Sequence, residues 1–307
     1  MSRWQVPAIP SPLASLYSHF PLVLLPPQLS TTPAPAIAEL WAFGPPPAGL
    51  SESLDPLCRA TQAHARFAGV ETSKVRWVDR DHVEAAPGGQ LPAVHTEDGD
   101  LLVGEEVDAW MSKKQAAAST GAGKGKRTSG AGSGFGTPQP DETATGTASR
   151  DPTHQAYTSL IETTLLPAVL CALYLSPAGT APSVVPPRDK PFLSACAGTL
   201  LNWNERRDRI EEVKRLRGGK VGKGTVLDLE EVEREAAETI EALEVKIKAK
   251  EGQGEWFAGA SSPTRLDALL YALLSIIRIL PAACDTVLRP ALERCPTLLR
   301  WVKQHDP

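Results

Sequence analysis

The sequence lacks most of the features that assign a chain to a protein class on sight. Its five cysteines are far apart among 307 residues, with no Cys-x-x-Cys pair and no histidine at zinc-ligand spacing, so we expect reduced, buried thiols and no metal site. The net charge is only -4, which provides no general positive field for binding nucleic acid. The sequence has no phosphate-loop, nucleophile-elbow or metal motif. We therefore expect no cofactor and no nucleic-acid partner.

Long hydrophobic runs are also missing. The most apolar stretch, 268–280, is shorter than the roughly 20 residues of a spanning helix and contains Arg278. The first 12 residues carry one arginine and several prolines, which is typical of neither a secretory signal nor an arginine-rich transit peptide. Only six residues follow Trp301, too few for a C-terminal anchor. We expect a retained N-terminus and any membrane attachment to be peripheral.

Proline and glycine, by contrast, are abundant, with 28 and 24 residues, and they concentrate outside the expected domains. Residues 113–152 are mostly Gly, Ser, Thr, Ala and Lys, so they bury too little apolar surface to offset ordering entropy and predict a disordered linker. Residues 1–35 form a Pro-rich arm with an apolar cluster that includes Phe20, Leu22 and Leu24. We expect this arm to cover its own domain or to bind a partner.

Residues 36–112 predict strand, helix, strand, hairpin and helix, the order of a thioredoxin-like domain with a mixed sheet. Ser53 is the expected N-cap of the first helix, with Asp55 in its first turn. Pro92 occupies the position of the fold's cis-proline. The expected strands are 39–43, 74–78, a segment after Pro92 and 101–103, and the expected helices run from Ser53 to about Gly69 and from Glu105 through Met111.

Residues 153–307 lack strand alternation and predict an all-α domain. Thr264 and Asp267 have the spacing of a capping box, in which each side chain bonds the other residue's backbone N–H. The helix that follows is nearly all apolar, so it must be surrounded by protein. The expected helices are 155–175, 192–216, 227–250, 264–280 and a last one near 291–302.

The whole pattern, α+β followed by all-α, resembles the glutathione-transferase fold, and within it the sequence is similar to the metaxin family. The similar segments are Leu40–Gly44, Ser53–Cys58, Ala65–Gly69, Gly89–Val94, Trp256–Ala268 and Leu292–Leu298. The resemblance implies a non-catalytic receptor or assembly subunit of the mitochondrial sorting and assembly machinery, on the cytosolic face of the outer membrane. Its implied partners are a membrane β-barrel insertase, a second metaxin-like subunit and β-barrel precursors. Candidate contacts are Phe20, Leu22, Leu24, Trp41, Trp256 and Phe257.

A glutathione-binding enzyme is the alternative, and a transferase-like module elsewhere in the cell is a third reading. A transferase needs a hydroxyl or thiol at the start of its first helix, where Ser51, Ser53 and Cys58 are the candidates. Ser53 is better explained as a cap, and Cys58 falls inside the helix. The fold's usual acidic residue followed by serine is replaced by Glu105-Glu106, which lacks the hydroxyl. We therefore assign no catalytic residue.

Overall fold

The computed structural model describes residues 35–46, 49–70, 72, 74–78, 86, 89–121, 152–175, 207, 209–217, 227–249, 256–257, 262–280 and 286–307. The sheet of the first half has the order β2-β1-β3-β4, in which β1 (Glu39–Phe43) is parallel to β2 (Lys74–Val78) and antiparallel to β3 (Ala93–His95). Strand β4 (Leu101–Val103) pairs with β3 as a hairpin. The mixed sheet and its four strands confirm the prediction for this half.

Helix α2 (Pro56–Phe67) connects the two parallel strands, as a crossover connection must. Its N-cap is Asp55, whose carboxylate accepts from the N–H groups of Leu57 and Cys58. The prediction that Ser53 caps this helix is therefore wrong. The Ser53 hydroxyl instead donates to the carbonyl of Phe43 at 2.6 Å, which ties the loop to the end of β1.

Helix α3 (Glu105–Gly121) extends beyond the expected domain end at residue 112 and into the segment expected as linker. The Gln115 amide donates to the carbonyl of Pro263 at 2.9 Å, and Lys114 pairs with Glu97. Alanines at 116–118 favour helix, because alanine has the highest helix propensity. These contacts and this composition account for the longer helix, and the rest of the expected linker, 122–151, lies outside the described residues.

The second half begins with one continuous helical stretch made of α4 (Pro152–Leu160), the π-helical turn η3 (Ile161–Leu165) and α5 (Leu166–Tyr174). Pro167 cannot donate to the carbonyl of Thr163, and the wider π turn lies just before it. The Thr164 hydroxyl donates to the carbonyl of Leu160 at 2.6 Å, which satisfies part of the disturbed ladder. By length and composition alone this stretch resembles a membrane span, but 56% of its apolar window is buried, which is typical of a core helix.

The central helix α8 (Arg265–Ile279) is buried at every position from Leu266 to Ile277. The prediction of a helix surrounded by protein is confirmed. Helix α7 (Leu229–Ala249) packs against two short helices, α9 (Leu288–Glu293) and α10 (Pro296–Gln304). The single last helix expected at 291–302 is thus wrong, because Pro296 begins a new helix. Of the helix expected at 192–216, residue 207 and residues 209–216 are helical and the others lie outside the described residues.

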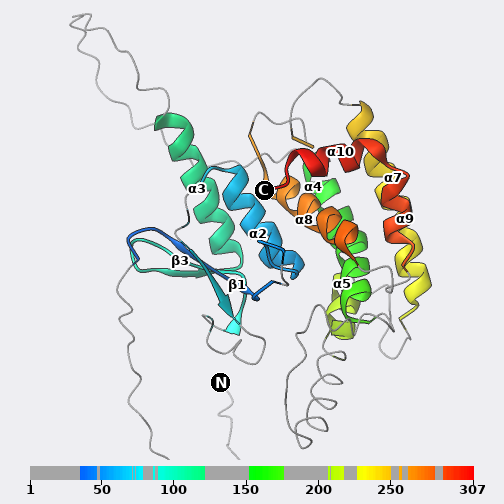
Figure 1. Cartoon of the computed structure of the whole chain (residues 1–307), viewed down its shortest axis with the longest axis horizontal. Coiled ribbons are helices and arrows are strands. Elements are labelled where there is room, and N and C mark those ends of the chain that lie inside the picture. The colour runs from blue at the N-terminus through cyan, green and yellow to red at the C-terminus, as the bar shows by residue number, and fades with distance from the viewer. Residues whose placement is uncertain are drawn as a thin grey trace, which may run out of the picture.

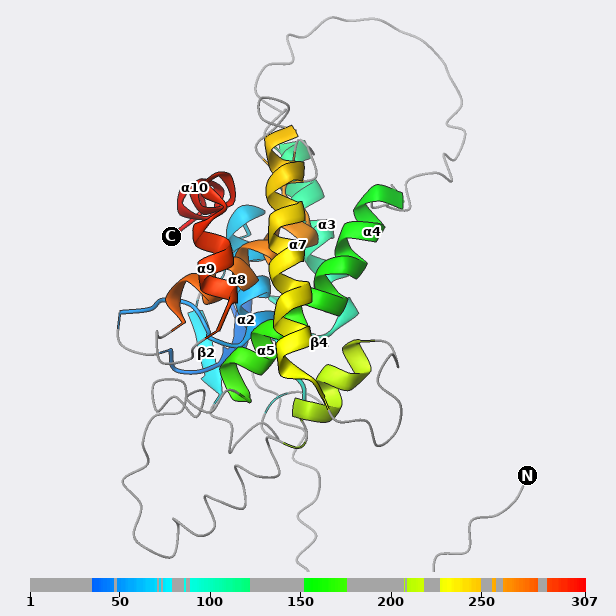
Figure 2. The same ribbon diagram turned by 90° about the vertical axis from the view of Figure 1, so that its right-hand side faces the viewer.

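Helices α2 and α3 cover one face of the sheet, and the remaining helices lie beyond them (Figure 1). A small core joins Leu40 and Val94 of the sheet to Ala65 of α2 and Met111 of α3. A larger core surrounds α8, with α7 on its outer side and α9 and α10 beside α7 (Figure 2). Because α2 packs directly on α8, this helix pair forms the junction between the two halves.

Candidate functional site

The start of α2 is the place where the glutathione-transferase fold would hold a thiolate, and here the chain fills it with its own carboxylate. Oδ1 of Asp55 lies 3.1 Å from the N–H nitrogen of Leu57 and 3.0 Å from that of Cys58. Pro56 has no N–H to offer. A helix N-terminus attracts an anion through its free N–H groups and its dipole. The anion at this helix is therefore Asp55.

Two of the three candidate nucleophiles of this region, Ser53 and Cys58, are buried and engaged in hydrogen bonds. Ser53 is 0% exposed, and its N–H donates to the side-chain carbonyl of Gln62 at 2.8 Å. Cys58 is also 0% exposed, and its Sγ accepts from the N–H of Phe43. Burial, and next the charge of Asp55, raise the pKa of the Cys58 thiol well above its usual range. A neutral thiol is a weak nucleophile. Ser51 is exposed.

Two further positions that the sequence aligned with this fold are the cis-proline and the turn before α3. The Leu91–Pro92 bond is cis, as the sequence predicted. Gly104, with φ of 56°, precedes Glu105 and Glu106 at the start of α3, and both glutamates are exposed. Two adjacent carboxylates repel an anionic tripeptide.

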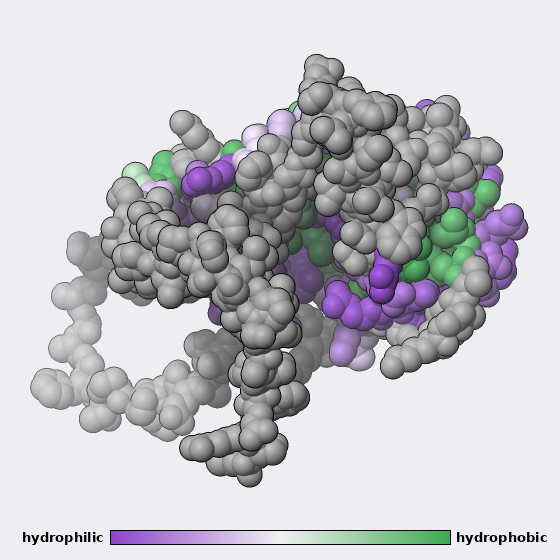
Figure 3. Space-filling view, turned by 90° about the horizontal axis from the view of Figure 1, so that it is seen from below, coloured by the Kyte–Doolittle hydropathy of each residue, from purple (hydrophilic) through white to green (hydrophobic). Residues whose placement is uncertain are grey.

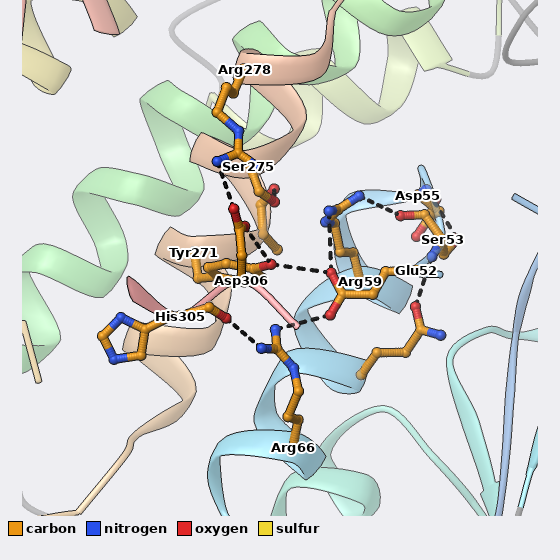
Figure 4. A network of polar contacts seen from close by, with 12 residues as sticks. Glu52, Ser53, Asp55, Arg59, Arg66, Tyr271, Ser275, Arg278, His305 and Asp306 are labelled. Atoms are coloured by element: carbon orange, nitrogen blue, oxygen red, sulfur yellow. Dashed lines mark hydrogen bonds and ion pairs between the residues drawn. The ribbon is translucent and has the colours of Figure 1, made fainter. Parts of the chain in front are cut away.

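A charged network at the α2–α8 junction was missed by the sequence reasoning (Figure 4). The Glu52 carboxylate, 6% exposed, pairs with Arg59 at 3.2 Å and with Arg66 at 2.9 Å. It also accepts from the Tyr271 hydroxyl of α8 at 3.4 Å. Arg59 and Arg66 are seven residues apart on an alanine-rich helix, so they share one face, and that spacing was the available signal.

Residues after α10 extend this network. The Asp306 carboxylate accepts from the Tyr271 hydroxyl at 3.3 Å and pairs with Arg278 at 2.7 Å. The carbonyl of His305 accepts from the Arg66 guanidinium. Burial, and next the charge of Glu52, raise the pKa of Tyr271. Its phenol is therefore a neutral donor whose single O–H is shared between two carboxylates.

The capping box at the start of α8 is formed, which confirms the assignment of Thr264 and Asp267 as structural residues. The Asp267 carboxylate accepts from the N–H and hydroxyl of Thr264 at 2.9 and 2.6 Å, and from the N–H of Phe257 at 2.7 Å. Burial raises the pKa of Asp267, although the bonds from Thr264 and Phe257 oppose this shift. The box thus holds the preceding loop as well as the helix end.

The residues predicted to contact a partner differ in their exposure. Phe257 is 1% exposed and packs edge-on against Tyr157, so it is a core residue and its assignment as a contact is wrong. Trp41 is also buried, with Arg76 stacked over its ring, and the same correction applies. Trp256 is partly exposed and remains a prediction. Phe20, Leu22 and Leu24 lie outside the described residues.

The described surface offers few other features. Seen from below, an exposed hydrophobic area on the helical half is bordered by hydrophilic residues (Figure 3). Among the described residues, exposed large hydrophobic side chains are Ile37, Leu57, Leu101, Val245 and Val287. Within the same part of the chain, no group of three or more His, Cys, Asp or Glu side chains is placed to hold a metal ion.

Comparison with known proteins supports the fold. Neither a scan of family models nor a search of curated proteins found a match to the sequence. The chain is similar to a solved glutathione S-transferase of Ceriporiopsis subvermispora, CsGST83044 in complex with glutathione, with 14% identity, a TM-score of 0.50 and coverage of 88% of this chain and 98% of that chain. Two glutathione transferases of Phanerochaete chrysosporium, GSTFuA3 and GSTFuA2, match with 14% and 10% identity, TM-scores of 0.45 and 0.47, coverage of 88% and 86% of this chain, and 96% and 98% of theirs. The chain has a glutathione-transferase-like fold.

Proposed function

We propose that this protein is a non-catalytic, metaxin-type subunit of the mitochondrial outer-membrane sorting and assembly machinery. It acts at the cytosolic face as a receptor or assembly subunit that aids the import and insertion of β-barrel precursors. The observation that carries the non-catalytic part is the Asp55 carboxylate on the N–H groups of Leu57 and Cys58. The sequence resemblance to metaxins supports the finer role.

Electrostatics give the size of the barrier to transferase chemistry. A glutathione thiolate at this helix end would have to share the N–H groups that Asp55 occupies, and about 4 Å is taken as the separation of the two charges. Two like charges at that separation repel by about 4 kcal/mol at an effective dielectric constant near 20. This corresponds to roughly a thousandfold loss of thiolate affinity. The site therefore favours a binding role over thiol chemistry.

Affinity purification tests the proposed role. The tagged chain should be isolated from mitochondria in mild detergent, and the co-eluting proteins identified by mass spectrometry. We expect a membrane β-barrel insertase and a second metaxin-like subunit. Recovery of the chain alone, as a cytosolic monomer, would contradict the assignment to the import machinery.

A glutathione assay tests the non-catalytic part separately. Calorimetric titration of the wild type with glutathione should give no measurable binding, and thiol-transfer assays should give no turnover. Asp55→Asn is the matched variant, because asparagine is also a good N-cap but carries no charge. Binding that increases in this variant would identify the carboxylate as the excluding group. Turnover by the wild type would instead favour the glutathione-dependent enzyme.

A further inference from the structure

The segment that follows α10 lies across the junction between the two halves of the fold. Its residues His305 and Asp306 contact α2 from the thioredoxin-like half and α8 from the helical half. Figure 4 shows Asp306 beside Tyr271 and Arg278, with the His305 carbonyl directed at Arg66. We infer that His305 and Asp306 form an interdomain latch, which holds α2 against α8 and whose release loosens that junction. This role goes beyond the proposed function and does not depend on the identity of any partner.

Polar contacts make up the first half of the latch. Asp306 pairs with Arg278 of α8 at 2.7 Å and accepts from the Tyr271 hydroxyl at 3.3 Å. The Tyr271 hydroxyl also lies 3.4 Å from Glu52, which in turn pairs with Arg66 of α2. Removal of Asp306 therefore acts on both helices, because one of its partners, Tyr271, also contacts Glu52.

Ring contacts make up the second half. The His305 ring lies 5.4 Å from the ring of Phe67 of α2, measured between centroids, and 4.9 Å from that of Trp256. It also lies 4.8 Å from the ring of Trp301 in α10. The His305 imidazole thus packs among aromatic side chains of α2, of the segment before α8 and of α10.

Buried polar atoms without a hydrogen-bond partner in the described part of the chain lower the stability of the closed latch. The latch can therefore open at a smaller cost in free energy. Buried nitrogens at Nε of Arg59, Nε of Arg66 and Nε2 of His305 have no hydrogen-bond partner among the described residues. A buried donor or acceptor without a partner opposes the closed state. The Arg278 and Asp306 side chains are 31% and 28% exposed, so water can reach their ion pair. A competing contact can therefore reach the same pair.

Hydrogen exchange of the full chain tests the latch through Asp306→Ala. Loss of a charged hydrogen-bond acceptor with two partners should accelerate exchange of the α2 amides about 10- to 100-fold, while the α7 amides change less than about twofold. Glu293→Ala is the matched control, because it breaks an exposed pair with Arg289 on α9 and should leave α2 unchanged.

Two results would overturn the latch. Wild-type exchange of α2 in Asp306→Ala would show that the segment holds nothing, and equal acceleration of α2 and α7 would show a contribution to global stability only. Should Asp306→Ala fail to fold, Asp306→Leu and Tyr271→Phe carry the same test, because both keep most of the side-chain volume and remove the shared hydrogen bond. Their double variant should accelerate α2 exchange by less than the product of the single effects, since they share one hydrogen bond. Multiplicative effects would contradict the shared contact.

Discussion

Replacing Asp267 with alanine should lower the free energy of unfolding by about 3 kcal/mol. The carboxylate is 0% exposed and accepts two hydrogen bonds from Thr264 and one from the N–H of Phe257. Loss of a helix cap costs about 1 kcal/mol. An unsatisfied buried N–H, here that of Phe257, costs a further ~2 kcal/mol. At roughly 2–4 °C per kcal/mol for a fold of this size, the melting temperature should fall by about 6–12 °C.

The matched control is Asp228→Ala at the start of α7. Asp228 also caps a helix, since it accepts from the N–H groups of Glu230 and Glu231 at 3.0 and 3.2 Å, but this site is exposed. Water can replace the lost acceptor there, so we expect the free energy of unfolding to fall by only about 0.5–1 kcal/mol. The difference between the variants isolates the buried Phe257 N–H.

Urea unfolding is the suitable assay, followed in parallel by far-UV circular dichroism and tryptophan fluorescence. Coincident transitions are needed before a single free energy is assigned. Equal losses for Asp267→Ala and Asp228→Ala would refute the reasoning, because burial of the Phe257 N–H would then contribute nothing. An intermediate loss in Asp267→Asn is expected, since its amide NH2 faces the N–H of Thr264 in one of its two orientations.

Four further predictions concern α2 and α7. Burial, and next the charge of Arg265, lower the pKa of His64 to about 4, so its contribution to stability is present above pH 6.5 and is lost as pH falls toward 4. Between pH 6.5 and 4 the free energy of unfolding should therefore change by about 1.4 kcal/mol per pH unit through His64, and His64→Gln should remove this dependence. Urea unfolding at several pH values measures it, and an unchanged dependence in the variant would contradict the prediction. Glu244→Ala should cost about 2 kcal/mol, because its carboxylate accepts from the N–H groups of Thr297 and Leu298; Glu241→Ala, in an exposed pair with Arg294, should cost less than about 1 kcal/mol. The same urea assay checks both, and equal losses would exclude a capping role. Burial raises the pKa of Glu244, but the donors Leu298, Lys248 and Thr297 outweigh it, so wild type should lose stability relative to Glu244→Ala below about pH 4.5. Asp55→Ala should cost about 1 kcal/mol and Asp55→Asn less than about 0.5 kcal/mol, and equal losses in thermal unfolding would argue against the cap.

Local patterns in the sequence were sufficient for the strands and for α2, α7 and α8, but not for the length of α3 or for the division of the last helix into α9 and α10. An aromatic-rich run ended by Gly44-Pro45 predicted β1, alternation predicted β2, turn residues predicted the β3–β4 hairpin, and the apolar run after Thr264 predicted α8. The capping box was predictable because its two residues are three apart, within one helical turn. The glutathione-transferase-like fold was expected from a resemblance, which rested on that order and on the capping box, and the fold is confirmed.

Contacts between distant residues were decided by the tertiary structure alone. Glu244 caps α10 from α7, across 54 residues to Leu298, and Tyr271 reaches Glu52 across 219. Sequence spacing carries no information about such pairs, because they form only after the helices pack. Even the choice of Asp55 over Ser53 as the N-cap of α2 depended on a distant residue. The carbonyl of Phe43, at the end of β1, accepts a hydrogen bond from the Ser53 hydroxyl. The sequence by itself thus determined the strands and the central helices, and only their packing decided which buried charges meet at the junction of the two halves.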